Sequence, residues 1–176
     1  MTAKVGIIGY PVGHSVSPAF QQAAFRFVGL DIQYVRWETP PEKLSERVTV
    51  LLEHEVWGAN ITVPHKQAIM SMLDEVDPSA ITIGAVNTIV KRDGSLLGYN
   101  TDAAGFSRGL QEDSGMDPAG TRVLILGSGG SARAVAFALT SQGVADLTIA
   151  SRTRSRAREL AAELPFQRAD MVSTLP

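Results

Sequence analysis

An apolar run at residues 123–126 leads straight into the glycine-rich turn Gly127-Ser128-Gly129-Gly130-Ser131, and a helical pattern follows at residues 134–139. A strand pattern at residues 147–150 and a further helical pattern at residues 155–164 continue the run. Alternation of this kind builds a doubly wound parallel sheet, and the turn lets backbone N–H groups reach a pyrophosphate at the positive end of a helix. We therefore predict a Rossmann-like, dinucleotide-binding α/β domain in the second half of the chain.

The end of the second strand in this domain indicates which nucleotide would bind. Sites for NAD usually have Asp or Glu there, which accepts hydrogen bonds from the ribose hydroxyls. This strand is followed by Ser151-Arg152-Thr153, and a guanidinium can bind a 2′-phosphate through two hydrogen bonds. The pattern favours NADP; the alternative is an arginine-rich helix face in solvent, which is our interpretation of Arg158. The candidate cofactor ligands are Gly127, Ser128, Gly129, Gly130, Ser131, Ser151, Arg152, Thr153, Arg154, Ser155 and Arg156.

Residues 1–101 also alternate between strand and helix patterns, which predicts a separate α/β domain. Asp93-Gly94 predicts a tight antiparallel hairpin within it. The second domain is then residues 102–176. The expected strands of the first domain are residues 5–8, 34–37, 59–63, 85–90 and 96–99, its expected helices are residues 17–28, 42–53 and 66–73, and a further helix is expected at residues 102–112.

Ser15 and Ser17 lie two residues apart at the predicted start of a helix. Two hydroxyls at a helix N-terminus could hold a carboxylate. Ser17 followed by Pro18 is also typical of an N-cap and first helical residue, so capping is an equally good explanation of Ser17.

Asn60 and Thr62 share one face of a predicted strand, and Lys66 is expected to open the next helix. A lysine in the first turn of a helix is locally unfavourable, which suits a role in proton transfer. The alternative is an ordinary flexible surface lysine, which is the commoner case. Asn87 in Gly-Ala-Val-Asn-Thr and Asp102 in Gly-Tyr-Asn-Thr-Asp form the last polar group. Asp102 would also serve as a helix N-cap.

Composition excludes several classes of protein. The chain has 176 residues and a formal net charge of −2, so it lacks the basic excess of a nucleic-acid-binding protein. No apolar stretch approaches the roughly 20 residues of a membrane span. The absence of cysteine excludes disulfides and thiolate metal sites, and it agrees with a reducing, cytoplasmic location. We expect no metal.

These motifs together resemble the shikimate dehydrogenase family. Their order and spacing carry the resemblance: Ser-x-Ser, Asn-Ile-Thr-Val-Pro-His-Lys, Gly-Ala-Val-Asn-Thr, Gly-Tyr-Asn-Thr-Asp, Gly-Ser-Gly-Gly-Ser-Ala and Ser-Arg-Thr-Arg-Ser-Arg. The resemblance implies an NADP-dependent enzyme that reversibly reduces 3-dehydroshikimate to shikimate in aromatic amino-acid biosynthesis. It also implies an N-terminal α/β substrate domain and a Rossmann-like NADP domain.

The resemblance also implies roles for individual residues. Ser15 and Ser17 would hold the substrate carboxylate, and Thr62, Asn87 and Asp102 would bind ring hydroxyls. Lys66 and Asp102 would flank the reacting oxygen as the catalytic pair, with Lys66 as the acid and base. The candidate substrate-binding residues are Ser15, Ser17, Asn60, Thr62, Lys66, Asn87 and Asp102.

Members of the family are usually longer, so this chain is expected to lack the C-terminal third and to carry an incomplete nucleotide domain. We expect residues 1–176 alone to be a poor catalyst that binds small molecules and can form a homodimer. Two alternatives remain: a quinate/shikimate dehydrogenase, and a non-catalytic module that binds shikimate or a nucleotide.

Overall fold

The computed structural model describes residues 2–164. It divides the chain into two compact units. The first unit contains residues 1–81 and 85–100, and the second contains residues 82–84 and the chain from Thr101 onward. Part of the predicted second domain, residues 165–176, lies outside the described residues.

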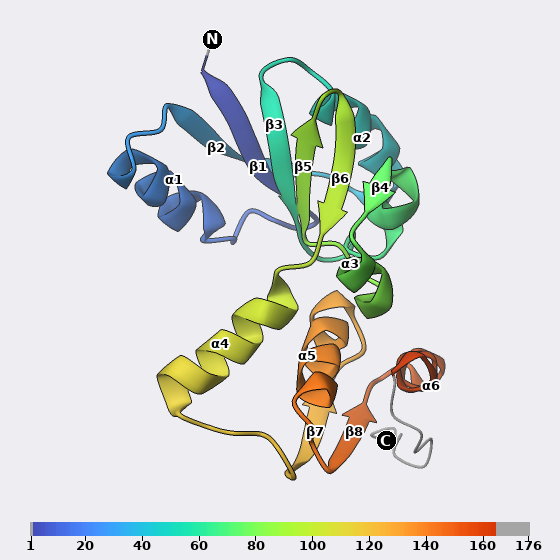
Figure 1. Cartoon of the computed structure of the whole chain (residues 1–176). Helices are drawn as coiled ribbons and strands as arrows, with labels where there is room; N and C mark the ends of the chain where they lie inside the picture. Colours follow the sequence, from blue (N-terminus) through green and yellow to red (C-terminus); the bar gives the residue numbers. More distant parts are fainter. Residues whose placement is uncertain (1, 165–176) are drawn as a thin grey trace. The chain divides into compact units, whose positions relative to one another are not determined.

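The first unit is built on a six-stranded sheet with the order β2-β1-β3-β5-β6-β4 (Figure 1). Strand β1 pairs in parallel with β2 and β3, whereas β5 runs antiparallel to both β3 and β6. The chain direction therefore reverses between β3 and β5. The strands are β1 (Ala3–Gly9), β2 (Ile32–Glu38), β3 (Val56–Ile61), β4 (Glu75–Val76), β5 (Thr88–Arg92) and β6 (Ser95–Tyr99).

Short helices connect these strands. Helix α1 packs on β2, and α2 packs on β3. The main core of the unit is aliphatic and includes Ile8, Ile61 and Ile89, each at most 2% exposed. The helices are α1 (Ser17–Phe27), the 3-10 helix η1 (Pro41–Lys43), α2 (Leu44–Leu51), the 3-10 helix η2 (Ala68–Met72) and α3 (Pro78–Ile83).

Strands β3 and β5 approach closely at Gly58. A Cβ atom on Gly58 would lie 2.2 Å from the backbone carbonyl oxygen of Ile89 on β5. The register pairs Gly58 with Val90 and Asn60 with Thr88. The missing side chain at residue 58 thus lets these two strands meet.

The predicted helix at residues 66–73 is wrong. The Lys66 carbonyl accepts a hydrogen bond from the Val86 N–H (2.7 Å). In an α-helix it would accept from the Met70 N–H, which donates to the Gln67 carbonyl instead (3.2 Å). Because a distant segment takes the Lys66 carbonyl, the α-helix is replaced by the short η2. Sequence patterns also missed α3 and β4, and the helix predicted at residues 42–53 is η1 followed by α2.

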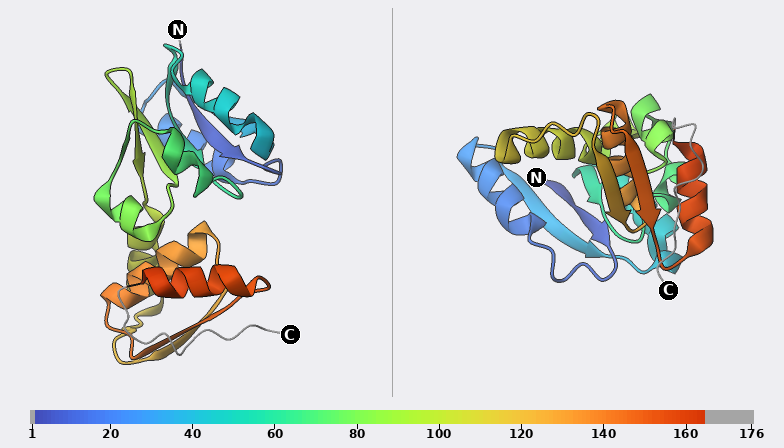
Figure 2. Two further views of the ribbon diagram at one scale, coloured as in Figure 1. Left: turned by 90° about the vertical axis from the view of Figure 1, so that its right-hand side faces the viewer. Right: turned by 90° about the horizontal axis from the view of Figure 1, so that it is seen from below.

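The second unit contains the parallel pair β7 (Arg122–Leu126) and β8 (Asp146–Ala150), with Leu126 beside Ala150. Helix α4 (Asp102–Ser114) packs against α5 (Gly130–Ser141), and α6 (Arg154–Glu163) packs on β8 (Figure 2). Buried side chains of β7, α5 and β8 form its core. The predicted α/β class and the order strand, glycine turn, helix, strand, helix are confirmed. Within residues 2–164, no helix is both long and apolar enough to cross a membrane.

Candidate functional site

Two loops of the first unit lie side by side at the carboxyl ends of β1 and β3. The Tyr10 N–H donates to the Val63 carbonyl (3.0 Å), and the Thr62 N–H donates to the Ile8 carbonyl (2.9 Å). A hollow of about 330 Å³ lies between the loops, and its lining includes Ser15 and Thr62. Two of the predicted substrate residues, far apart in sequence, therefore line the same hollow.

Ser15 and Ser17 are hydrogen-bonded to each other at the start of α1. Helix α1 begins at Ser17 with Val16 as its N-cap, so the prediction that Ser17 is the N-cap is wrong by one residue. The Ser17 N–H donates to Ser15 Oγ (3.3 Å), and Ser15 therefore supplies an acceptor for one of the N–H groups that lack a partner at the helix start. An accepting hydroxyl keeps its own proton, which Ser15 can donate to a ligand. Arg36 anchors this loop by donating to the Ser15 carbonyl (2.8 Å).

Asn60 and Asn87 are joined through residues that sequence patterns missed. Tyr34 donates its phenol proton to Asn60 Oδ1 (2.7 Å), and Asn60 Nδ2 donates to Thr88 Oγ1 (3.4 Å). Thr88 in turn donates to Asn87 Oδ1 (2.9 Å). Burial raises the pKa of Tyr34 to about 12, although a hydrogen bond with Ser17 opposes the rise. The aromatic side chain of Tyr34 fits a strand core, so its sequence position gave no signal of a polar role.

Lys66 lies in a turn before η2 and not in the first turn of an α-helix, so the helix-start argument for its chemistry does not apply. The turn is fixed by buried groups. The His65 ring, 1% exposed, places Nε2 2.7 Å from the Thr39 carbonyl, and the Val86 N–H holds the Lys66 carbonyl. The lysine backbone is thereby fixed next to the segment that carries Asn87.

Asp102 belongs to the second unit, where it is the half-buried first residue of α4. Its predicted alternative role as N-cap is wrong, because Thr101 occupies the N-cap position and makes no side-chain capping bond.

The glycine turn of the second unit joins β7 to α5 next to the end of β8. Gly127 has φ +123°, which favours glycine, and its N–H donates to the Ala150 carbonyl (2.7 Å). The hydroxyls of Ser128 and Ser151 lie 2.9 Å apart. The structure thus brings together the two segments predicted to bind the cofactor. The residues that follow Ser151 are exposed: Arg152, Thr153, Arg154, Ser155 and Arg156.

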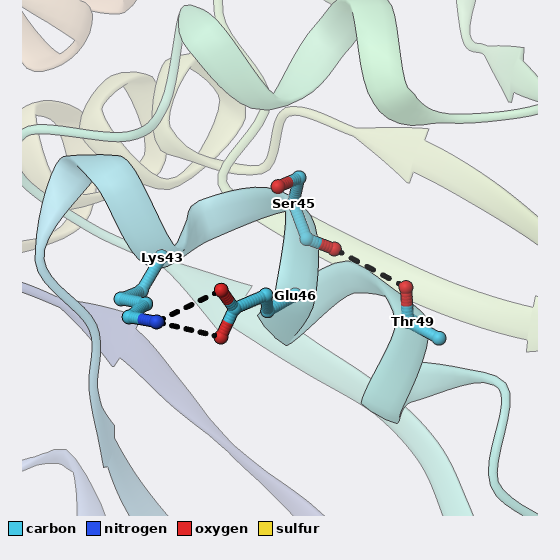
Figure 3. Close-up of polar contacts among 4 residues, drawn as sticks. All are labelled: Lys43, Ser45, Glu46 and Thr49. Carbon is cyan, nitrogen blue, oxygen red and sulfur yellow. Dashed lines mark hydrogen bonds and ion pairs between the residues drawn. The ribbon is translucent and has the colours of Figure 1, made fainter.

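A separate hollow of about 240 Å³ lies between β2 and α2, and its lining includes Lys43, Glu46 and Arg47. Each of these three side chains already has a hydrogen-bond partner. Lys43 Nζ donates to both carboxylate oxygens of Glu46 (2.9 and 3.1 Å), and this contact raises the pKa of Lys43 (Figure 3). The Thr49 hydroxyl donates to the Ser45 carbonyl (3.3 Å) in the same helix. Arg47 donates to Thr39 Oγ1 (3.3 Å). We interpret this surface as the stabilised start of α2.

Two family models match the chain. Residues 7–89 match the shikimate dehydrogenase substrate binding domain, and residues 110–175 match shikimate / quinate 5-dehydrogenase. The NADP(+) shikimate dehydrogenase of Moorella thermoacetica is 51% identical over 163 residues, which are 93% of this chain and 55% of that protein. The chain therefore spans about half the length of this curated relative.

Solved structures agree with these matches. The shikimate dehydrogenase of Aquifex aeolicus superposes with a TM-score of 0.86 and 37% identity over 99% of this chain and 63% of that one. The Thermus thermophilus enzyme in complex with NADP(H) and shikimate gives a TM-score of 0.84 at 39% identity, with the same coverage of both chains.

Proposed function

Since this chain belongs to the shikimate dehydrogenase family, we propose that it contributes the shikimate-binding part and the adenosine-binding part of an NADP-dependent enzyme that interconverts 3-dehydroshikimate and shikimate in aromatic amino-acid biosynthesis. The observation that carries the proposal is the meeting of Ser15 and Thr62 at one hollow of the first unit. The bonded series of Asn60, Thr88 and Asn87 supports it.

The proposed substrate domain is residues 1–101, and each candidate residue has a chemical task. Ser15 and Ser17 donate to the carboxylate, and Asn60, Thr62 and Asn87 bind ring hydroxyls. Lys66 donates a proton to the carbonyl oxygen of 3-dehydroshikimate during reduction and removes it from the shikimate hydroxyl in the reverse direction. Asp102 is proposed to flank the same oxygen.

The proposed cofactor domain is residues 102–176, and its residues fit NADP. A Cβ at Gly127 or Gly129 would meet no atom within 4 Å, so the turn leaves open space where a pyrophosphate could approach the backbone. Gly127 to Ser131 would hold the pyrophosphate, and Ser151 to Arg156 would hold the 2′-phosphate. When bound, NADP supplies or accepts the hydride.

Binding and turnover measurements test this function. Shikimate is titrated into the purified chain calorimetrically, and NADPH formation from shikimate and from quinate is followed spectroscopically. Shikimate binding supports the proposal, and faster turnover of quinate contradicts it. Binding without turnover favours the alternative of a non-catalytic module for residues 1–176.

Arg152→Asp is expected to weaken NADP binding by at least about tenfold, because a charge-assisted bond to the 2′-phosphate is replaced by repulsion. NAD, which lacks that phosphate, should bind equally well or better. The dissociation constants of both cofactors are measured by titration calorimetry. Arg158→Asp makes the same charge change at an exposed position inside α6, which begins after Arg152, and serves as the control. Equal losses for both cofactors would make Arg152 a structural residue.

Ser15→Ala is expected to raise the Kd for shikimate by about tenfold, because a hydrogen bond to a carboxylate is lost. The free energy of unfolding of this variant should also fall by about 0.5–1 kcal/mol, because the Ser17 N–H loses its acceptor. Ser114→Ala is the matched control, because Ser114 Oγ accepts from the Met116 N–H at the same 3.3 Å. If both variants lose stability and both keep shikimate affinity, Ser15 acts only as the acceptor for the Ser17 N–H.

We also propose a homodimer and a cytoplasmic location. Leu124 and Leu126 on β7 are 58% and 71% exposed, which supports association. The lack of cysteine agrees with a reducing compartment. Sedimentation velocity at increasing concentration tests the dimer.

A further inference from the structure

An arginine of β2 reaches the loop that carries Ser15. Arg36 donates from its terminal nitrogen Nη2 to the Ser15 carbonyl (2.8 Å). A guanidinium has several N–H donors, and within residues 2–164 Arg36 makes no further hydrogen bond or ion pair. The residue is exposed. Its remaining donors and its positive charge are therefore free to meet a ligand at this loop.

The register of the sheet places Arg36 in one row with a residue of the proposed substrate site. Arg36 on β2 pairs with Ile7 on β1, and Ile7 pairs with Asn60 on β3, so the row crosses three strands that lie next to one another in Figure 1. Residues paired in this way point their side chains to the same face of a sheet. Because adjacent strands lie about 4.8 Å apart, about 10 Å separates the Cα atoms of Arg36 and Asn60.

The hollow beside this row has no lysine or arginine in its lining, and the candidate residues Ser15 and Thr62 that line it are neutral. Burial raises the pKa of Tyr34, and a hydrogen bond with Ser17 opposes that rise. A hydrogen bond lowers the pKa of a phenol when the phenol oxygen accepts it, so the Ser17 proton is directed to Tyr34 in the free chain. A carboxylate that leaves water for this hollow is costly to bury without a partner of opposite charge.

We propose that Arg36 is a specificity-determining residue of the substrate site: it anchors the Ser15 loop with one N–H and binds the substrate carboxylate with its other donors and its charge. This inference rests on the proposed function. The planar guanidinium matches the two oxygens of a carboxylate. The ring of the substrate then extends from Arg36 toward Asn60, which is proposed to bind a ring hydroxyl. Arg36 belongs to none of the sequence motifs that identify the family.

The charge of Arg36 is tested with one charged and one neutral ligand. Arg36→Gln removes the charge and keeps a hydrogen-bond donor, so the Kd for shikimate should rise about tenfold in titration calorimetry. The methyl ester of shikimate carries no charge, and its Kd should stay within about twofold of the original value. Arg36→Lys keeps the charge and should weaken shikimate binding by no more than about threefold.

Arg26→Gln is the matched control, because it makes the same change at an exposed arginine in the last turn of α1. At a rise of 1.5 Å per residue, Arg26 lies about 14 Å along the helix from Ser17. That distance exceeds the Debye length of about 8 Å at physiological ionic strength. The Kd for shikimate should therefore stay within about twofold of the original value.

The salt dependence of binding separates the charge of Arg36 from its anchoring contact. Raising NaCl from about 0.05 M to about 0.5 M screens charges, so the Kd of the original chain for shikimate should rise about threefold or more. Arg36→Gln should lose this dependence, and His14→Gln, which changes an ionisable residue in the lining of the hollow, should keep it. If Arg36 only holds the loop, the salt dependence persists in Arg36→Gln and the ester is weakened as much as shikimate. Either of those results overturns the inference.

A smaller probe separates this inference from the proposed function. Cyclohexenecarboxylate has the ring and the carboxylate of shikimate without its hydroxyls, and its binding is followed through the backbone amide resonances of residues 15–17 in ¹⁵N-correlated NMR spectra. If shikimate does not bind, but the probe moves these signals in the original chain and not in Arg36→Gln, the proposed function is wrong and the carboxylate subsite stands. Equal movement in both chains, or none in either, overturns the inference.

If shikimate binds and Arg36→Gln binds it within about twofold of the original chain, the inference alone is overturned, because that change is far smaller than the loss of a charge-assisted bond. Should Arg36→Gln fail to fold, Arg36→Met keeps the apolar stem and removes the charge, and the same three measurements are made on it.

Discussion

Replacing Lys66 by alanine is expected to lower kcat for shikimate oxidation by about 100-fold or more, with a smaller change in KM. This range is usual for loss of a positioned acid or base, since the proton then moves without a side chain to accept it. The structure supports a fixed position: the Lys66 carbonyl is bonded to Val86, and the preceding His65 is buried against Thr39. The measurement is steady-state NADPH formation by a protein that carries residues 1–176.

Two further variants sharpen the Lys66 experiment. Lys66→Arg keeps the positive charge but holds its proton too tightly for transfer at neutral pH, so kcat should remain low while KM stays near its original value. Lys43→Ala removes a lysine that is paired with Glu46 on the surface and should change neither constant. A kcat for Lys66→Ala within a few-fold of the original would rule out Lys66 as the acid and base.

Gly58→Ala is expected to destabilise the first unit by about 3 kcal/mol or more, at the upper end for overpacking. The added methyl carbon would lie 2.2 Å from the Ile89 carbonyl oxygen. Backbone of a paired strand cannot move aside as a flexible side chain does, so β3 and β5 must separate. Urea unfolding followed by circular dichroism measures the loss.

Gly105→Ala gives the matched control. Gly105 lies inside α4, and a Cβ there would meet no atom within 4 Å. The same substitution should therefore stabilise the protein by about 0.5–1 kcal/mol, because alanine loses less conformational freedom in a helix. If Gly58→Ala unfolds at the same urea concentration as the original chain, the close approach of β3 and β5 is incorrect.

Local sequence signals predicted the features that depend on a few neighbouring residues. Asp93-Gly94 forms the expected hairpin turn, with φ of +51° and +82°. Gly29 ends α1 with φ +73°, and the glycine turn joins β7 to α5 as expected. In each case a positive φ or a tight turn is required, and glycine or a short polar residue meets that requirement at low cost.

The features that sequence reasoning missed depend on segments far apart in the chain. The helix at Lys66 fails because Val86 takes its carbonyl, and no local pattern reports such a contact. The hydrogen bonds of Tyr34 could not be expected without the strand order, since β2 and β3 are neighbours of β1 and not of each other. Family motifs name residues that contact ligands, and they say little about the buried groups that hold those residues.

The reversal of chain direction between β3 and β5 has a consequence for how the candidate site assembles. The hairpin β5–β6 is local and can form early, whereas its pairing with β3 closes a longer loop and is expected to form later. Asn60 from the end of β3 and Thr88 from the beginning of β5 become neighbours when that pairing forms. The Ile61 amide, which donates to the Asn87 carbonyl, is protected by the same event. The rate at which that one amide gains protection from hydrogen exchange during refolding therefore reports when this part of the site comes into existence.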